Sequence, residues 1–334
     1  MSATPVTPPA SPLPPAPPVV DPPAQVEAPG YAASWSVSDK IGVAMAWLAG
    51  LMLCVIAGSI VIYMLVRGIQ YVNLDLLTKH PQPSLDQSKS GGFLDPIIGT
   101  FVLTILGTVI AAPLGVAIAV WLSEYGKPAW LARAVESGIE VVAGIPSIVL
   151  AIFGLLVFSN AAFGFLSFTA EGGAVFGRSF FTAGAMMGLL ALPLVVGSTR
   201  EALQAIPVHV REASYALGKD RASTIRRVLL PAARPGIATG TSLGMGRIAG
   251  DSAIVVILLG ASLQLQEENS IPILGDLKGT GSTLTSYVYN NSPAGEGNAP
   301  EKAYAAAFVL LAIVILLNFA VDLISRRRKV SWQS

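Results

Sequence analysis

The sequence predicts an all-α, polytopic membrane protein with six transmembrane helices. Of its 334 residues, 53% are hydrophobic and 12% are charged, whereas roughly a quarter of the residues in a typical soluble domain are charged. A helix needs about 20 mostly apolar residues to cross a bilayer. Six runs approach or exceed this length: 41–66, 97–122, 141–158, 180–198, 236–259 and 303–321. A large helical bundle in water is the alternative, but six such runs would leave too little polar surface to cover them.

A proline-rich segment precedes the first span. The first 30 residues contain eleven prolines and neither Lys nor Arg, so they lack the basic and apolar regions of a signal peptide. We expect residues 1–38 to form a disordered tail. Residues 39–329 are then expected to form the transmembrane domain, which includes a long polar loop at 200–235.

The distribution of Lys and Arg predicts which loops face the cytoplasm. Six spans place both termini on one side of the membrane. That side holds fourteen Lys and Arg residues, and the loops of the other side hold six. Positively charged loops remain in the cytoplasm. We therefore expect a multi-pass protein of the cell membrane with cytoplasmic termini, a cytoplasmic 200–235 loop, and outward loops at 67–95 and 260–302.

Helix breakers occur inside several spans. Pro113 lies in the second span, Gly144 and Pro146 in the third, and Pro193 in the fourth. Within lipid, such residues are tolerated where neighbouring helices or water satisfy the freed carbonyl groups. These helices should therefore pack on one another or line a pathway. Glu124, at the cytoplasmic end of the second span, is expected to pair with a loop Arg or to cap a helix rather than to contact substrate.

The fifth span combines small residues with two charges. We expect Gly240, Gly244 and Gly246 to allow close helix packing. Arg247 and Asp251 are the strong charges that we place within a span, and an Arg there should face a cavity or a partner rather than lipid. Their spacing of four residues puts both on one face of a helix, where they can pair.

The loop stretch 211–231, REASYALGKDRASTIRRVLLP, predicts two short amphipathic helices. Good helix formers run from Glu212 to Leu217, and Gly218 can take the positive φ that ends this first helix. A second helix is expected from near Arg221 to Pro231, with apolar residues at helical spacing in both. A basic loop that lies on anionic lipid is the alternative. The apolar faces consist of small residues rather than bulky anchors, which favours docking into a protein groove.

This loop resembles the EAA loop of the membrane subunits of binding-protein-dependent ABC importers. That pattern is EAA, three residues, G, nine residues and I-x-L-P. The matching positions are Glu212, Ala213, Gly218, Leu230 and Pro231, with Ser214 in place of the second Ala and Val228 in place of Ile. The resemblance implies that the loop is a coupling helix that sits in a cleft of a cytoplasmic ATPase, and that the five matching residues form its ATPase-coupling site.

Further stretches resemble the phosphate importer permeases. They are 121–133, 141–158, 191–213 and 225–240, and TREALQAIP and PAARPGIATG resemble the PstA type more than the PstC type. The resemblance implies a type I permease fold and a permease subunit of an importer for inorganic phosphate. It also implies three kinds of protein partner: a homologous PstC-like permease, two PstB-like ATP-binding subunits and an extracytoplasmic PstS-like phosphate-binding protein. Because the binding protein selects the substrate, an importer for another oxyanion or small solute is the alternative.

The resemblance also covers the charged part of the fifth span. The family pattern R-x-x-G-E is matched by Arg247, Gly250 and Asp251, with Asp in place of Glu. Arg247 and Asp251 are then expected to line the substrate pathway. The guanidinium offers a fork of donors to phosphate, and the carboxylate limits the positive charge so that the anion is not trapped. A structural ion pair that fixes helix packing is the alternative.

Several function classes are opposed by the sequence. It holds no Gly-x-x-x-x-Gly-Lys-Ser/Thr stretch, so another polypeptide should hydrolyse ATP, and we expect no enzyme, catalytic residue or cofactor. Cys54 is the single cysteine, and His80 and His209 lie in different loops, which argues against a disulfide or a metal site.

A membrane-embedded hydrolase would need a Ser with His, a metal or paired Asp at membrane depth. A passive channel would not need a docking loop. Membrane lipid is an expected partner and nucleic acid is not.

Overall fold

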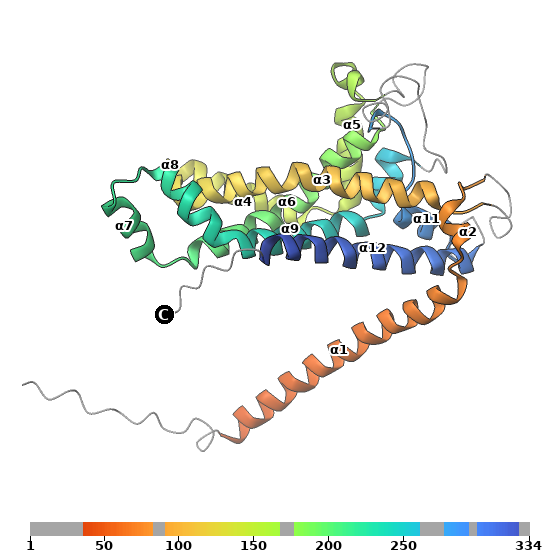
Figure 1. Cartoon of the computed structure of the whole chain (residues 1–334), viewed down its shortest axis with the longest axis horizontal. Coiled ribbons are helices and arrows are strands. Elements are labelled where there is room, and N and C mark those ends of the chain that lie inside the picture. Colours follow the sequence, from red (N-terminus) through yellow and green to blue (C-terminus); the bar gives the residue numbers. More distant parts are fainter. Residues whose placement is uncertain (1–35, 83–90, 168–176, 261–276, 294–298, 327–334) are drawn as a thin grey trace, which may run out of the picture. The chain divides into compact units, whose positions relative to one another are not determined.

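The structure is a computed structural model that describes residues 36–82, 91–167, 177–260, 277–293 and 299–326. The described residues form helices and turns without a strand, as predicted for an all-α protein (Figure 1). The α-helices are α1 (Val37–Tyr71), α2 (Leu74–Thr78), α3 (Leu94–Val120), α4 (Ala129–Gly144), α5 (Ser147–Phe158), α6 (Phe180–Gln204), α7 (Val208–Ala216), α8 (Arg221–Thr224), α9 (Leu230–Gly250), α11 (Leu284–Asn291) and α12 (Pro300–Arg326). Short π-helical turns are η2 (Trp121–Tyr125), η5 (Ile225–Leu229) and η6 (Val255–Leu259), and η3 (Ala161–Leu166) is a 3₁₀ turn. The predicted tail lies outside the described residues up to residue 35.

Four helices are long and apolar enough to cross a membrane. They are α1, α3 with its continuation η2, α6 and α12. The chain divides into two compact units at Ser59 and Ile60, and the site described below lies within the second unit.

The third predicted span is two helices rather than one. We expected one span at 141–158 with the helix breakers Gly144 and Pro146 inside it. In the structure α4 ends at Gly144, α5 begins at Ser147, and the two are bent by 109°. Pro146 explains the bend, because it disfavours the helical conformation of the residue before it. Ile145 is extended accordingly, with φ −71° and ψ 128°. If this bent pair counts as one span, the described residues contain up to five spans.

The fifth predicted span is also interrupted. We expected a helix across 236–259, but α9 ends at Gly250, and Asp251 is extended with φ −82° and ψ 127°. Helical structure resumes shortly afterwards and ends in η6. The expectation of one continuous helix here is wrong, and the total of six crossings stays a prediction.

Close packing joins α3 to α6. Neither Pro113 nor Pro193 ends its helix. A Cβ atom added to Gly115 of α3 would lie 2.7 Å from Cγ1 of Val195 on α6, and one added to Gly107 would lie 3.3 Å from Cβ of Met187. The small residues thus bring the two backbones together, which confirms that the proline-containing helices pack on one another.

The glycines of α9 contact the same helix α6 from another side. An added Cβ would lie 3.0 Å from Cβ of Ser198 at Gly240, and 3.3 Å from Cβ of Ala191 at Gly244. Close packing is therefore confirmed at these two glycines. At Gly246 no described atom outside its own helix lies within 4 Å of an added Cβ, so the expectation of close packing within the chain is wrong there.

The helices α3, α6, α9 and α12 lie side by side, with α7 and α8 at one end of the bundle and α11 at the other (Figure 1). At the α11 end, the backbone N–H of Leu284 donates to Oγ1 of Thr100 (2.9 Å), and Oγ1 of Thr285 donates to the carbonyl of Ala249 (2.6 Å). These bonds tie α11 to the N-terminal part of α3 and to the last turn of α9. The basic 200–235 loop and the 277–293 part of the 260–302 loop therefore lie at opposite ends of the bundle.

Candidate functional site

A helical hairpin at one end of the bundle contains the predicted coupling loop. Its first helix, α7, begins at Val208, four residues earlier than we expected, and ends in a Schellman motif. The N–H of Gly218 donates to the carbonyl of Tyr215 (2.9 Å), and the N–H of Lys219 donates to the carbonyl of Ser214 (3.3 Å). Gly218 has φ +73°, which confirms the predicted left-handed position.

The second helix of the hairpin begins at a capping residue. The Asp220 side chain accepts a hydrogen bond from the N–H of Ser223 (3.2 Å), which satisfies a free donor at the start of α8. The hydroxyls of Ser214 and Thr224 lie 2.8 Å apart and join α7 to α8. Ser214 is 5% exposed and Thr224 is fully buried. The Ser that departs from the family pattern thus forms a hydrogen bond across the hairpin.

We expect Ser214→Ala to destabilise the hairpin by about 1 kcal/mol, the typical net value of a buried hydrogen bond. Oγ1 of Thr224 would keep its bond to the carbonyl of Asp220 (3.0 Å), so the loss stays small. Thr224→Ala removes both bonds and should cost more. Thermal unfolding of the purified single and double variants measures the coupling between the two hydroxyls. Strict additivity of the two changes would contradict the assigned bond.

The second helix does not end at Pro231. Helical structure continues from α8 through η5 into α9, and Pro231 lies in the first turn of α9. The N–H of Leu230 donates to the carbonyl of Ile225, five residues earlier. This wider turn accommodates a proline, which lacks an N–H and would clash with the carbonyl four residues before it. The predicted helix end at Pro231 is therefore wrong, and the loop is directly continuous with a bundle helix.

An apolar cluster packs the hairpin against the bundle. Its buried members are Leu203, Ile206, Val210, Ile225, Leu229 and Ala233, and partly buried Val120, Val228 and Leu230 pack against it. These residues come from α3, α6, α7, η5 and α9 and from the connection between α6 and α7. The hairpin therefore has a fixed base on three bundle helices.

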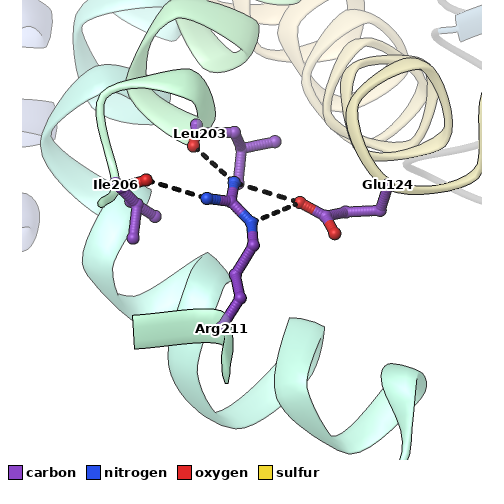
Figure 2. A network of polar contacts seen from close by, with 4 residues as sticks. All are labelled: Glu124, Leu203, Ile206 and Arg211. Atoms are coloured by element: carbon purple, nitrogen blue, oxygen red, sulfur yellow. Dashed lines mark hydrogen bonds and ion pairs between the residues drawn. The ribbon is translucent and has the colours of Figure 1, made fainter. Parts of the chain in front are cut away.

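A partly buried polar network lies beside this cluster (Figure 2). Nε and Nη2 of Arg211 each lie 3.2 Å from Oε1 of Glu124, while Nη1 donates to the carbonyl of Ile206 and Nη2 to that of Leu203, both at 2.8 Å. The side chains of Arg211 and Glu124 are 19% and 7% exposed. Cations near a helix C-terminus satisfy its last carbonyls and favourably meet its dipole. The expectation that Glu124 pairs with a loop Arg is thus confirmed, and the partner is Arg211.

A second contact joins η2, the turn that contains Glu124, to α8. The guanidinium carbon of Arg221 lies 5.3 Å from the centre of the Tyr125 ring, a cation–π distance. Arg200 of α6 forms a separate ion pair with Glu136 of α4. The basic residues at this end of the bundle therefore include several that connect helices.

The five predicted coupling residues fall into two groups. Glu212, Ala213 and Gly218 are exposed on the hairpin, while Leu230 and Pro231 are half-buried at its base. Exposed apolar side chains accompany the first group, and Leu217 is 78% exposed. The structure therefore places Glu212, Ala213 and Gly218 on an accessible surface and the Leu-Pro pair in the support beneath it.

The predicted Arg247–Asp251 pair is not formed in the described residues. Arg247 is exposed in the last turn of α9, whereas Oδ1 of Asp251 accepts a hydrogen bond from the N–H of Ile254 (3.0 Å). Pairing at a spacing of four requires a continuous helix, and α9 ends between the two residues. The Gly250-Asp251 sequence before an apolar run is a helix-end and helix-start signal that could have revealed this break.

The described residues contain no group of three or more His, Cys, Asp or Glu side chains that could hold a metal ion. The described residues form a bundle of long apolar helices with an accessible polar hairpin supported at one end, an arrangement typical of a membrane protein. Residues 111–330 match the model of the family "Binding-protein-dependent transport system inner membrane component". The chain belongs to this family of ABC importer permeases, which work with an ATPase, a second permease and a binding protein.

Relatives and solved structures agree with this assignment. The phosphate transport system permease protein PstA 1 of Mycobacterium tuberculosis (strain ATCC 25618 / H37Rv) is 34% identical over 74% of this chain and 75% of its own. The phosphate transport system permease protein PstC of Xylella fastidiosa (strain 9a5c) is 31% identical over 70% and 72%. A bacterial ABC transporter involved in the import of alginate is 15% identical and matches 88% of this chain and 97% of its own with a TM-score of 0.59. The fold is that of type I ABC importer permeases.

Proposed function

We propose that this chain is the transmembrane permease subunit of an ABC importer for inorganic phosphate. The phosphate permeases that it resembles at 34% and 31% identity support this substrate. The observation that carries the transport role is the hairpin, which presents Glu212, Ala213 and Gly218 on an accessible surface above an apolar base. A PstC-like permease would complete the pathway, and a PstS-like protein would deliver the anion. Two PstB-like subunits would hydrolyse ATP, so this chain acts as a transport subunit and not as an enzyme.

The hairpin is proposed to lie in the cytoplasm with both termini. The positive-inside rule supports this orientation, and so does the separation of the basic 200–235 loop from α11 at opposite ends of the bundle. ATP is available on the cytoplasmic side, where a docked ATPase must lie. The exposed face of α7 would then enter the ATPase, while the buried Val210 and Ser214 hold α7 to the rest of the hairpin.

Arg247 and Asp251 are proposed to line the phosphate pathway. Arg247 is exposed at the C-terminal end of α9 and is free of the pairing that we expected with Asp251, so its donors are available to an oxyanion. Asp251 would act beside it in two ways. Its negative charge limits anion trapping, and its hydrogen bond from the N–H of Ile254 caps the helical segment that follows the end of α9.

Uptake of radiolabelled phosphate by a strain that lacks this subunit tests the proposed substrate. We expect the full-length chain to restore phosphate uptake and to leave sulfate and molybdate uptake unchanged. If the chain instead restores uptake of sulfate or molybdate and not of phosphate, the alternative substrate class replaces the proposed one. Phosphate uptake that is unaffected by loss of the subunit would contradict the proposal.

A further inference from the structure

Two neighbouring residues of η2 each hold one helix of the hairpin. Glu124 binds Arg211 of α7, and Tyr125 lies against the guanidinium of Arg221 of α8. The η2 turn is the direct continuation of α3. One end of α3 therefore contacts both halves of the hairpin, at residues far away in the sequence.

The connection matters because α3 is not adjacent to the hairpin in the sequence. The chain leads from α6 into α7 through 205–207, and α8 continues through η5 into α9. A movement of the hairpin therefore reaches α6 and α9 through the backbone. It can reach α3 through side-chain contacts, and apolar contacts such as that of Val120 with the cluster of Leu203 have no preferred direction.

The Arg211 network supplies a directional link. Its guanidinium has four hydrogen bonds, two to Glu124 and one each to the carbonyls of Leu203 and Ile206 (Figure 2). These partners belong to η2, to the end of α6 and to the connection that follows α6. Because the guanidinium is planar and its donors are fixed in a fork, displacement of α7 changes several bonds at once. The low exposure of both side chains protects the ion pair from screening by salt.

We propose that η2 is a second attachment point for the coupling hairpin, through which ATPase-driven movement reaches α3 together with α6 and α9. Glu124 and Arg211 are the positioning residues of this attachment, and Tyr125 with Arg221 is its second contact. The proposal rests on the proposed function, since it assigns to these residues the transfer of movement from a docked ATPase. It predicts that α3 and the hairpin move as one body during transport.

Substitution of Glu124 tests the attachment in the complete complex reconstituted in liposomes. We expect Glu124→Ala to lower the number of phosphate ions imported per ATP hydrolysed by about tenfold, the scale of one lost charge-assisted network. The amount of ATPase that co-purifies with the chain should stay at the wild-type level. Glu136→Ala is the matched control, because its ion pair joins α4 to Arg200 of α6 without contacting the hairpin. The number of phosphate ions that the Glu136→Ala complex imports per ATP should remain within about twofold of wild type, as expected for a half-exposed ion pair.

A cysteine pair separates coupling from folding. In a Cys54→Ser background, Glu124→Cys with Arg211→Cys should show the low ratio. A short bifunctional thiol reagent that joins the two positions should restore the ratio at least fivefold, within the tenfold loss expected above. An unchanged ratio in Glu124→Ala, or cross-linked complexes that still have the low ratio, would overturn the attachment. A wild-type complex without ATP-dependent phosphate import would instead overturn the proposed function.

Discussion

Arg247→Gln is expected to reduce phosphate import by at least about tenfold while the complex still assembles. The substitution removes the positive charge of an exposed donor group in the last turn of α9, and hydrogen bonds to charged groups are stronger than neutral ones by enough to account for this loss. Assembly should be retained, because Arg247 is exposed and forms no ion pair with Asp251 in the described residues. Initial rates of radiolabelled phosphate uptake, measured at equal amounts of complex in the membrane, give the result.

Two control variants show whether the loss of uptake in Arg247→Gln comes from the lost donor group at this position. Arg247→Lys keeps the charge but loses the planar fork of donors, so we expect intermediate uptake. Arg234→Gln removes another exposed Arg from the opposite end of α9 and should leave phosphate import close to wild type. Normal uptake by Arg247→Gln would contradict a pathway role for this residue.

Gly218→Val is expected to lower ATPase co-purification by about tenfold. Gly218 has φ +73° at the end of α7, and this conformation costs roughly 1–2 kcal/mol for a residue with a Cβ atom. A β-branched side chain is among the least tolerated there. Relief of the strain would unwind the Schellman motif and misplace Glu212 and Ala213, which lie one to two turns earlier. Pull-down of the ATP-binding subunit with the tagged permease measures docking.

Gly218→Asn is the control for backbone strain. Asn tolerates the left-handed region better than most other residues with a Cβ atom. Apart from the two chain neighbours, no described atom lies within 4 Å of a Cβ added at this position. We therefore expect Asn to retain most of the docked ATPase. If Val and Asn lower docking equally, the added side chain obstructs the ATPase and strain is not the cause. Full docking by the Val variant would contradict the assignment of Gly218 to the coupling surface.

The sequence was most informative where the physical rule is local. The positive φ of Gly218 follows from a glycine after a run of good helix formers, and Glu124 at a span end predicted an ion pair with a loop Arg. The partner Arg211 lies 87 residues away. Its identity depends on how α3 packs beside α6, which no local pattern specifies.

The prolines were visible in the sequence as helix breakers, but the size of the effect of each one was not. Pro113, Pro193 and Pro231 lie within helices, whereas Pro146 separates α4 from α5 by a bend of 109°. A proline is tolerated when neighbouring turns can widen, as the bond from Leu230 to Ile225 shows. Whether a turn can widen at a proline, and so whether the helix continues, depends on the packing around it.

The pathway residues show the same limit. A spacing of four residues predicted contact between Arg247 and Asp251, but this rule assumes a helix that α9 does not continue. The capping role of Asp251 was readable in principle from Gly250 before it and the apolar run after it. Its position near the carbonyl of Ala249, which is bound by Thr285 of α11, depends on a contact between distant segments.

ATP-driven phosphate accumulation by the purified complex is the most direct test of the central claim. The permease pair, the ATP-binding subunits and the binding protein are reconstituted in liposomes, and labelled phosphate is followed with ATP or a non-hydrolysable analogue on the hairpin side. We predict accumulation with ATP when the binding protein is present on the opposite side, and none with the analogue. Equal phosphate entry with ATP and with the analogue would contradict the account, because the hairpin would then have no ATPase movement to transmit.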